Sequence, residues 1–190
     1  MPNKTPMSRF PIHDDLTAPE ESLPILKGLQ SSAGQLPNFL GVLAGSAAAL
    51  RGYVRFRAEL RKGVLPGGTP ERIGLAVAGL HSSEPDLRQH TRAARDAGIG
   101  LDEIRRARQF DSADARQAAL LRWLKPLAEH AGAVPVHLHE EAIEAGWTEE
   151  ELLEAVGVVA LESFQAMIDV AGDVPVDGSS ESTRQLRAVA

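Results

Sequence analysis

The chain of 190 residues contains no cysteine. This absence excludes disulfides, thiolate metal sites and thiol nucleophiles from the chemistry of its own residues. Aromatic residues make up only 4% of the chain, whereas alanine is abundant. This balance favours helices packed through small side chains over aromatic-rich strands, so the sequence predicts an all-α protein.

An excess of positive charge is also missing. The chain has 20 Lys and Arg against 26 Asp and Glu, a formal net charge of −6, and no basic stripe. We therefore expect no nucleic-acid partner. The opening sequence MPNKTPMSRFPIHDD lacks the apolar segment of a signal peptide. The most apolar later run, residues 152–161, is short and contains Glu154, so we expect no membrane span and a cytoplasmic protein.

The chain is long enough for one domain with a sizeable core. Residues 1–18 are Pro-rich and polar without periodicity, and are predicted to form an extended N-terminal arm. Residues 173–190, which contain Gly-Ser-Ser-Glu-Ser, are expected to form a flexible C-terminal tail. Between them, residues 19–172 are predicted to form a single all-α domain.

Apolar residues at helical spacing, interrupted by Pro and Gly, predict a series of helices. The start at Thr69 combines a hydroxyl cap, a proline at the first helical position and an acid in the first turn. The predicted helices cover about residues 36–43, 47–62, 70–81, 83–97, 101–109, 112–131, 136–145 and 149–171.

Two segments share one turn pattern at an offset of 48 residues, AGIGLDEI at 97–104 and AGWTEEEL at 145–152. In each copy the second residue, a glycine, is predicted to end a helix in the left-handed conformation. The fourth residue is predicted to cap the next helix, with the glutamate of the copy at the third helical position. Duplication and shared turn chemistry both remain open as explanations.

The stretch ERIGLAVAGLHSSEPDLRQH, residues 71–90, carries the candidate site. It predicts a helix with Glu71 near its start, a break near His81, and a second helix with Asp86 and His90. Because residues four apart share a helix face, Asp86 would orient the ring of His90 and raise its affinity for a proton. In a hairpin of these helices, Glu71 can bond directly to His90 but lies a full helix length, about 18 Å, from the break, so contact with His81 is not expected. We predict Glu71, Asp86 and His90 as catalytic residues.

Each of these residues also has a structural interpretation. Ser83 and Asp86 fit a helix-capping pair worth about 1 kcal/mol. Glu71 is stabilised as an anion by the dipole of its own helix. Asp86 and His90 also fit an ordinary surface or subunit-contact pair. The sequence leaves these alternatives open.

No metal or cofactor is expected. His137 and His139 could chelate a metal in an extended chain, but no third ligand stands at a characteristic spacing. No Gly-rich phosphate loop, G-x-S-x-G turn or H-E-x-x-H pair is present. The predicted site therefore consists of acid and base side chains alone.

The spacing from Glu71 to Ser83, Asp86 and His90 resembles the signature of the carboxymuconolactone decarboxylase and alkylhydroperoxidase-D family. In the peroxidase branch that signature is a Glu, then Cys-x-x-Cys, then a His four residues on. Here Ser83 and Asp86 stand at the two cysteine positions. The resemblance therefore identifies a cysteine-less member, and thiol peroxidase chemistry is excluded for this chain on its own.

The resemblance extends beyond this signature. The segment GQLPNF at residues 34–39 looks like the G-x-x-P-N segment of longer, peroxidase-related members, and the similarity covers about residues 20–172. Members of the family are all-α and usually assemble as trimers or hexamers, with the site near a subunit interface. The resemblance thus implies a homotrimer or homohexamer, and the sequence does not separate the two.

Asp86-Leu87-x-x-His90 is similar to the acid-Leu-x-x-His of decarboxylase-type members, which also lack the cysteine pair. Those members remove carbon dioxide from a lactone acid, which requires a placed proton donor and a group that holds a carboxylate. The resemblance implies that His90 supplies the proton and that an arginine binds the substrate acid. The candidate substrate-binding residues are His81, Ser83, Arg88 and Arg92.

From these observations we expect acid/base chemistry, decarboxylation or proton transfer, on a small carboxylated or lactone substrate. One alternative is a non-catalytic ligand-binding or structural oligomer of the same family. Another is a peroxidase-related protein that lacks intrinsic thiol peroxidase activity and relies on the thiols of a partner. The sequence does not name the substrate.

Overall fold

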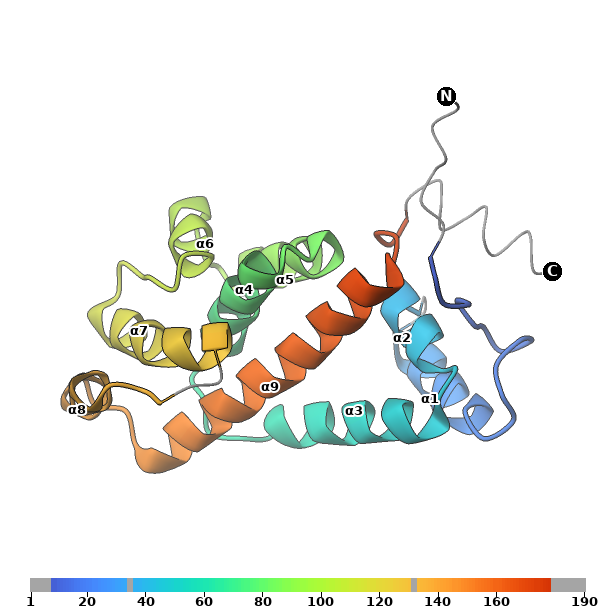
Figure 1. Cartoon of the computed structure of the whole chain (residues 1–190), viewed down its shortest axis with the longest axis horizontal. Helices are drawn as coiled ribbons and strands as arrows, with labels where there is room; N and C mark the ends of the chain where they lie inside the picture. The colour runs from blue at the N-terminus through green and yellow to red at the C-terminus, as the bar shows by residue number, and fades with distance from the viewer. Residues whose placement is uncertain (1–7, 34–35, 131–132, 179–190) are drawn as a thin grey trace, which may run out of the picture. The chain divides into compact units, whose positions relative to one another are not determined.

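The computed structural model describes residues 8–33, 36–130 and 133–178 (Figure 1). Within these ranges the regular structure is helical and no residue lies in a strand, as the composition predicted. Parts of the predicted arm and tail (residues 1–7 and 179–190) and of the GQLPNF segment (Gly34 and Gln35) lie outside the described residues. The helices are α1 (Leu23–Ala33), α2 (Asn38–Leu43), α3 (Ala47–Leu60), α4 (Thr69–His81), α5 (Glu84–Asp96), α6 (Leu101–Ala107), α7 (Ala115–His130), α8 (Val136–Glu144) and α9 (Glu149–Gly172).

Every helix predicted from the sequence is present, with ends that differ by a few residues. Helix α1 was not predicted. Ser22 before the helix and Pro24 in its first turn are start signals, but the first turn has no acid and Gly28 interrupts the helix interior. Burial of Leu26, which is fully inaccessible, shows that packing rather than local propensity holds this helix.

The chain divides into two compact units. The first runs to Ala58 and resumes at Met167. Within it Ile12, from the predicted arm, forms a small apolar cluster with Val42 and Val174. The described parts of the predicted arm and tail are therefore packed against this unit, and the proposal that residues 19–172 fold as one domain stays a prediction.

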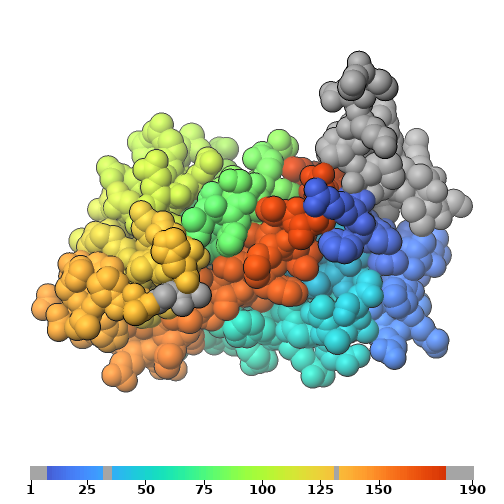
Figure 2. Space-filling model, viewed as in Figure 1, coloured from blue at the N-terminus to red at the C-terminus, as the bar shows by residue number. Residues whose placement is uncertain are grey.

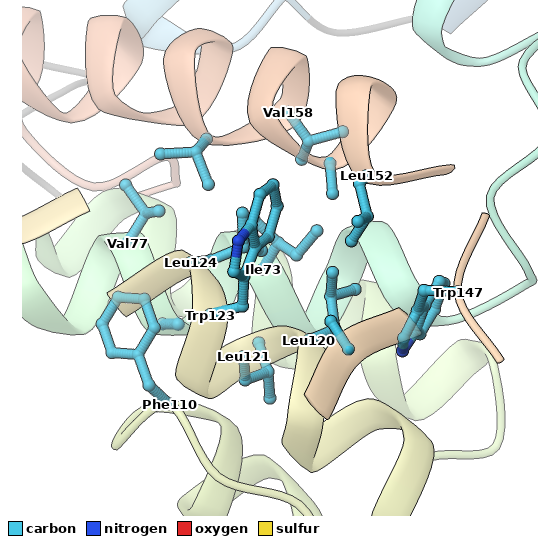
Figure 3. Packing of buried hydrophobic residues seen from close by; sticks show 14 residues of the cluster. Ile73, Val77, Phe110, Leu120, Leu121, Trp123, Leu124, Trp147, Leu152 and Val158 are labelled. Carbon is cyan, nitrogen blue, oxygen red and sulfur yellow. The ribbon is translucent and has the colours of Figure 1, made fainter. Parts of the chain in front are cut away.

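The second unit comprises residues 59–166 and contains the α4–α5 hairpin. Its main core is formed by apolar side chains of α4, α7, α8 and α9 (Figure 3). Ile73 and Val77 of α4 face Trp123 of α7, while Leu152 and Val158 of α9 point toward them from the other side. This packing fixes α4 and the first part of α9, the two helices that deliver carboxylates to the candidate site.

Helix α9 is long and apolar enough to cross a membrane by length and composition, but 44% of its most apolar stretch is buried. One such helix is weak evidence for a span, because core helices of globular proteins have the same composition. Within the second unit its residues at helical spacing, such as Leu152 and Ala155, are buried, while Leu153 is 73% exposed. Figure 2 shows orange atoms of α9 at the molecular surface. The absence of a membrane span therefore remains a prediction.

The repeated turn pattern is confirmed in part. Gly98 and Gly146 both have positive φ, at 80° and 91°, as predicted for residues that end a helix. In the second copy Thr148 and Glu151 form a full capping box, with backbone-to-side-chain bonds of 2.9 and 3.2 Å. In the first copy Glu103 instead binds Arg72 of α4 at 2.7 Å, because Gly100 offers no side chain to complete the box.

The start of α4 also differs from the prediction. Thr69 is the first helical residue and the capping position is Gly68, at φ 80°. The Thr69 hydroxyl is buried and exchanges hydrogen bonds of 3.2 and 2.9 Å with the side-chain amide of Gln117 on α7. A tertiary hydrogen bond has therefore taken the place of the predicted local cap.

Candidate functional site

The α4–α5 hairpin is closed by a sharp turn at the predicted break. Ser82 has the left-handed conformation, φ 56°, and the backbone N–H of Ser83 returns to the carbonyl of Ala78 at 3.0 Å. The hydroxyl of Ser83 then accepts the backbone N–H of Asp86 at 3.4 Å, as predicted for a helix cap. The turn thereby sets α5 antiparallel to α4.

The ring of His90 lies between two glutamates. Its Nδ1 lies 2.9 Å from Oε2 of Glu71 on α4, and its Nε2 lies 2.9 Å from Oε2 of Glu162 on α9. The first of these bonds is the one that the predicted hairpin allows. The His90 side chain is 6% exposed, Glu162 12% and Glu71 29%. Glu71 is therefore the member of the triad most open to solvent.

The close approach of His90 to α4 depends on Gly74. A Cβ atom at Gly74 would overlap the His90 ring, and Cε1 of the ring would be its nearest atom. Gly74 is buried and lies one helical turn after Glu71, on the face that the ring covers. The missing side chain thus makes room for the imidazole beside the carboxylate that binds it.

The two glutamates control the protonation of His90. Burial disfavours the charged imidazolium, but the charge and hydrogen bond of Glu162, with those of Glu71, outweigh it and raise the pKa of His90 from 6.5 to about 10. At neutral pH the ring is therefore an imidazolium that donates one N–H to each glutamate. With both carboxylates ionised, the triad of Glu71, His90 and Glu162 carries a net charge of −1.

Asp86 does not contact the ring of His90 as predicted, and its catalytic role stays a prediction. Both ring nitrogens of His90 are bonded to glutamates, so Asp86 does not orient the ring. Asp86 is 2% exposed and instead accepts a hydrogen bond from the side-chain amide of Gln165 on α9. Glu162 and Gln165 lie about one turn apart on the same face of α9. Glu162 therefore reaches His90, and Gln165 reaches Asp86.

The predicted substrate-binding residues do not gather at His90. His81 ends α4, and its buried Nε2 has no hydrogen-bond partner among the described residues. Ser83 is buried at the start of α5. Arg88 and Arg92 line an open groove on the exposed face of α5, whereas His90 points from the buried face. Their roles in substrate binding remain predictions.

Three residues of this site were not predicted from the sequence: Gly74, Glu162 and Gln165. A signal for Glu162 was present. Leu152, Ala155, Val159, Glu162 and Ala166 follow at spacings of three and four, so Glu162 falls on the apolar stripe of α9. A carboxylate on such a stripe requires a buried partner, and His90 is that partner.

Among the described residues, no group of three His, Cys, Asp or Glu side chains has the arrangement of a metal site. The His137 and His139 pair lies on α8, where the ring of His139 lies 6.1 Å from that of Trp123. A helix separates the side chains of residues two apart onto different faces, so this pair does not have the extended geometry that a chelate would need.

Comparisons with known proteins concern the family and the fold of the chain. Residues 47–129 match the Carboxymuconolactone decarboxylase family, a segment that contains Glu71, Ser83, Asp86 and His90. The match covers less than half of the chain, and it is to the family whose signature the spacing of those residues resembles. Among curated protein sequences, none matches this chain.

Solved structures share the fold. An uncharacterized peroxidase-related protein from Silicibacter sp. TM1040 is similar with a TM-score of 0.76 and 17% identity, over 94% of this chain and 95% of that one. A second such protein, of alkylhydroperoxidase AhpD core type from Ralstonia eutropha JMP134, gives a TM-score of 0.78 and 18% identity, over 92% and 94%. The debrominase Bmp8, solved in complex with 2,3,4-tribromopyrrole, is similar with a TM-score of 0.69 and 13% identity, over 90% of this chain and 92% of that one. The chain is thus a cysteine-less protein of the alkylhydroperoxidase-D-like fold.

Proposed function

We propose that this protein transfers protons on a small substrate, with Glu71 as the base that contacts the substrate. The observation that carries the proposal is the position of the Glu71 carboxylate. Its Oε2 is fixed by His90, while no described residue bonds its Oε1, and the side chain is 29% exposed. A carboxylate with one oxygen held and the other open suits proton abstraction.

His90 and Glu162 have supporting roles in this proposal. The imidazolium donates to Oε2 of Glu71 and fixes the orientation of the carboxylate. Glu162 holds the opposite side of the ring and keeps it charged. Glu71 takes a proton from a C–H next to a carbonyl through Oε1 and returns it to another carbon of the substrate. Such a step is balanced within one substrate and requires no thiol.

The charge of the site limits which substrates can bind beside Glu71. A triad with a net charge of −1 repels an anion beside Glu71, and Arg88 and Arg92 are on the opposite face of α5. An uncharged, lactone-like ring therefore fits better than a free carboxylic acid, and isomerising proton transfer fits better than decarboxylation. The complex of Bmp8 with a brominated pyrrole is consistent with a fold of this kind accepting a small uncharged ring.

A second candidate is a purely structural triad. Both ring nitrogens of His90 are already bonded, and these bonds connect α4, α5 and α9. In that case Glu71 and Glu162 stabilise the fold only, and the protein is a non-catalytic oligomer or ligand-binding member of its family.

We also propose that the protein forms a homo-oligomer in the cytoplasm. Light scattering after gel filtration is the direct test of assembly.

The test of the proposed function is hydrogen exchange into candidate substrates. Small lactones and small carboxylic acids from aromatic-compound breakdown are incubated with the protein in deuterium oxide. The loss of their C–H signals is followed by proton NMR. We expect exchange in lactones but not acids, and its loss in Glu71→Gln.

Glu84→Gln is the matched control, because it removes an exposed carboxylate from the neighbouring helix. If no compound exchanges and Glu71→Gln changes only stability, the structural candidate is correct. Peroxide consumption by the purified protein alone would contradict both.

A further inference from the structure

An open groove of about 610 Å³ lies on the second unit, along the exposed face of α5 and the end of α6. Leu87 and Thr91 form part of its lining. Three arginines of α5, Arg88, Arg92 and Arg95, and Arg108 at the end of α6 surround them. The groove is therefore built from guanidinium groups of two separate helices.

The charge of this groove is opposite to that of the chain. Four arginines face two carboxylates, Glu84 and Asp96, which gives +2 locally, whereas the whole chain has −6. Among the described residues, only Arg88 of these four has a carboxylate partner, Glu84 at 2.9 Å, and both side chains of that pair are more than half exposed. No described residue bonds the guanidinium groups of the other three. These cations are available to a ligand.

The spacing of the arginines suits a ligand with more than one charge. Arg88, Arg92 and Arg95 follow at helical spacing on one face, and their backbone positions span about 10 Å along α5. Arg108 is fixed from the other side, since a Cβ atom at Gly79 of α4 would lie 3.1 Å from its carbonyl oxygen. Its backbone thus packs closely on α4, and the groove does not depend on a loose loop.

We propose that this groove binds a small molecule that carries two or more adjacent oxyanion groups, phosphate or carboxylate. Planar guanidinium groups match such oxyanions through paired hydrogen bonds. The site is distinct from the Glu71–His90–Glu162 triad, because the arginines lie on the face of α5 opposite His90. The inference does not depend on the proposed proton transfer.

The test is calorimetric titration at low ionic strength with orthophosphate, pyrophosphate, tripolyphosphate and citrate. We expect pyrophosphate and tripolyphosphate to bind one to one, with orthophosphate weaker by about tenfold or more. Citrate distinguishes the two chemistries, since tighter citrate binding assigns the groove to carboxylates and tighter pyrophosphate binding to phosphates. Failure of every multivalent anion to bind would overturn the proposal.

Variants locate the binding. The double substitution Arg92→Gln with Arg95→Gln, and separately Arg108→Gln, should each weaken binding of the tightest anion by about tenfold. The control is Arg51→Gln with Arg55→Gln, which removes equal charge from exposed arginines one turn apart on α3. Equal weakening in the control would show a general charge effect and contradict the proposal. Binding of an acidic peptide but of no small anion would do the same, in favour of a protein partner.

Discussion

Gly74 and His90 are in contact across the α4–α5 hairpin so closely that a single methyl group does not fit between them. The imidazole occupies the space of the missing side chain, and its Nδ1 is thereby placed 2.9 Å from Glu71. The arrangement of the candidate site thus depends on a residue with no chemistry of its own.

Gly74→Ala should displace the ring of His90 and break its bond to Glu71. We expect a loss of about 1–3 kcal/mol in the free energy of unfolding, as for other overpacked core positions. Any proton exchange catalysed by Glu71 should fall with it. Urea unfolding and the exchange assay measure the two effects.

Gly52→Ala is the matched control, since Gly52 is inside α3 and nothing lies within 4 Å of its added Cβ. There the same substitution should stabilise the protein by about 0.5–1 kcal/mol, because alanine is the better helix former. If Gly74→Ala also raised the free energy of unfolding, the contact with His90 would have no effect on stability.

The stability of the protein should decrease at alkaline pH because of His90. The pKa of His90 is raised in the folded state, so its stabilising contribution is complete below the unfolded value of 6.5 and is lost as pH rises through about 10. The measurement is the free energy of unfolding against pH for the wild type and His90→Gln. The difference between the two should shrink from pH 6.5 to pH 10, and a constant difference would show that the folded pKa is not raised.

Asp86 and Gln165 should contribute to stability as a hydrogen-bonded pair, so that removing one partner costs more than removing both. Gln165→Met removes the donor and leaves the carboxylate of Asp86 buried, at a cost of about 1–3 kcal/mol. The double variant Asp86→Leu with Gln165→Met removes both polar groups and should recover most of that loss. Thermal unfolding of the three proteins measures this, and additive losses would argue against a paired role.

The helices and one bond of the site could be predicted because their signals are local. Pro, Gly and apolar spacing mark the ends of most helices, and the spacing of Glu71 and His90 in a hairpin was enough to expect their contact. Helix α1 was not predicted, although Ser22 and Pro24 mark its start, because its first turn has no acid and Gly28 interrupts its interior. Its formation depends on tertiary packing, which local patterns do not contain.

The partner of Asp86 could not be predicted from its own helix. The residues that bind Asp86 and the second nitrogen of His90 are on α9, more than seventy positions away along the chain. The role of Gly74 could not be predicted for a similar reason. A glycine inside a helix can be assigned to a close contact only when the position of the opposing ring is known. Glu162 alone had a usable signal, a carboxylate on an apolar stripe.

The protonation state of His90 is the most direct test of the account, because the proposed base is held by the charged ring between Glu71 and Glu162. NMR titration of the imidazole nitrogens in the wild type and Glu162→Gln measures it. We predict that His90 stays charged through pH 8 with a pKa of about 10, and that Glu162→Gln lowers this value. A ring that titrates near 6.5 in both proteins would contradict the triad and the function proposed for it.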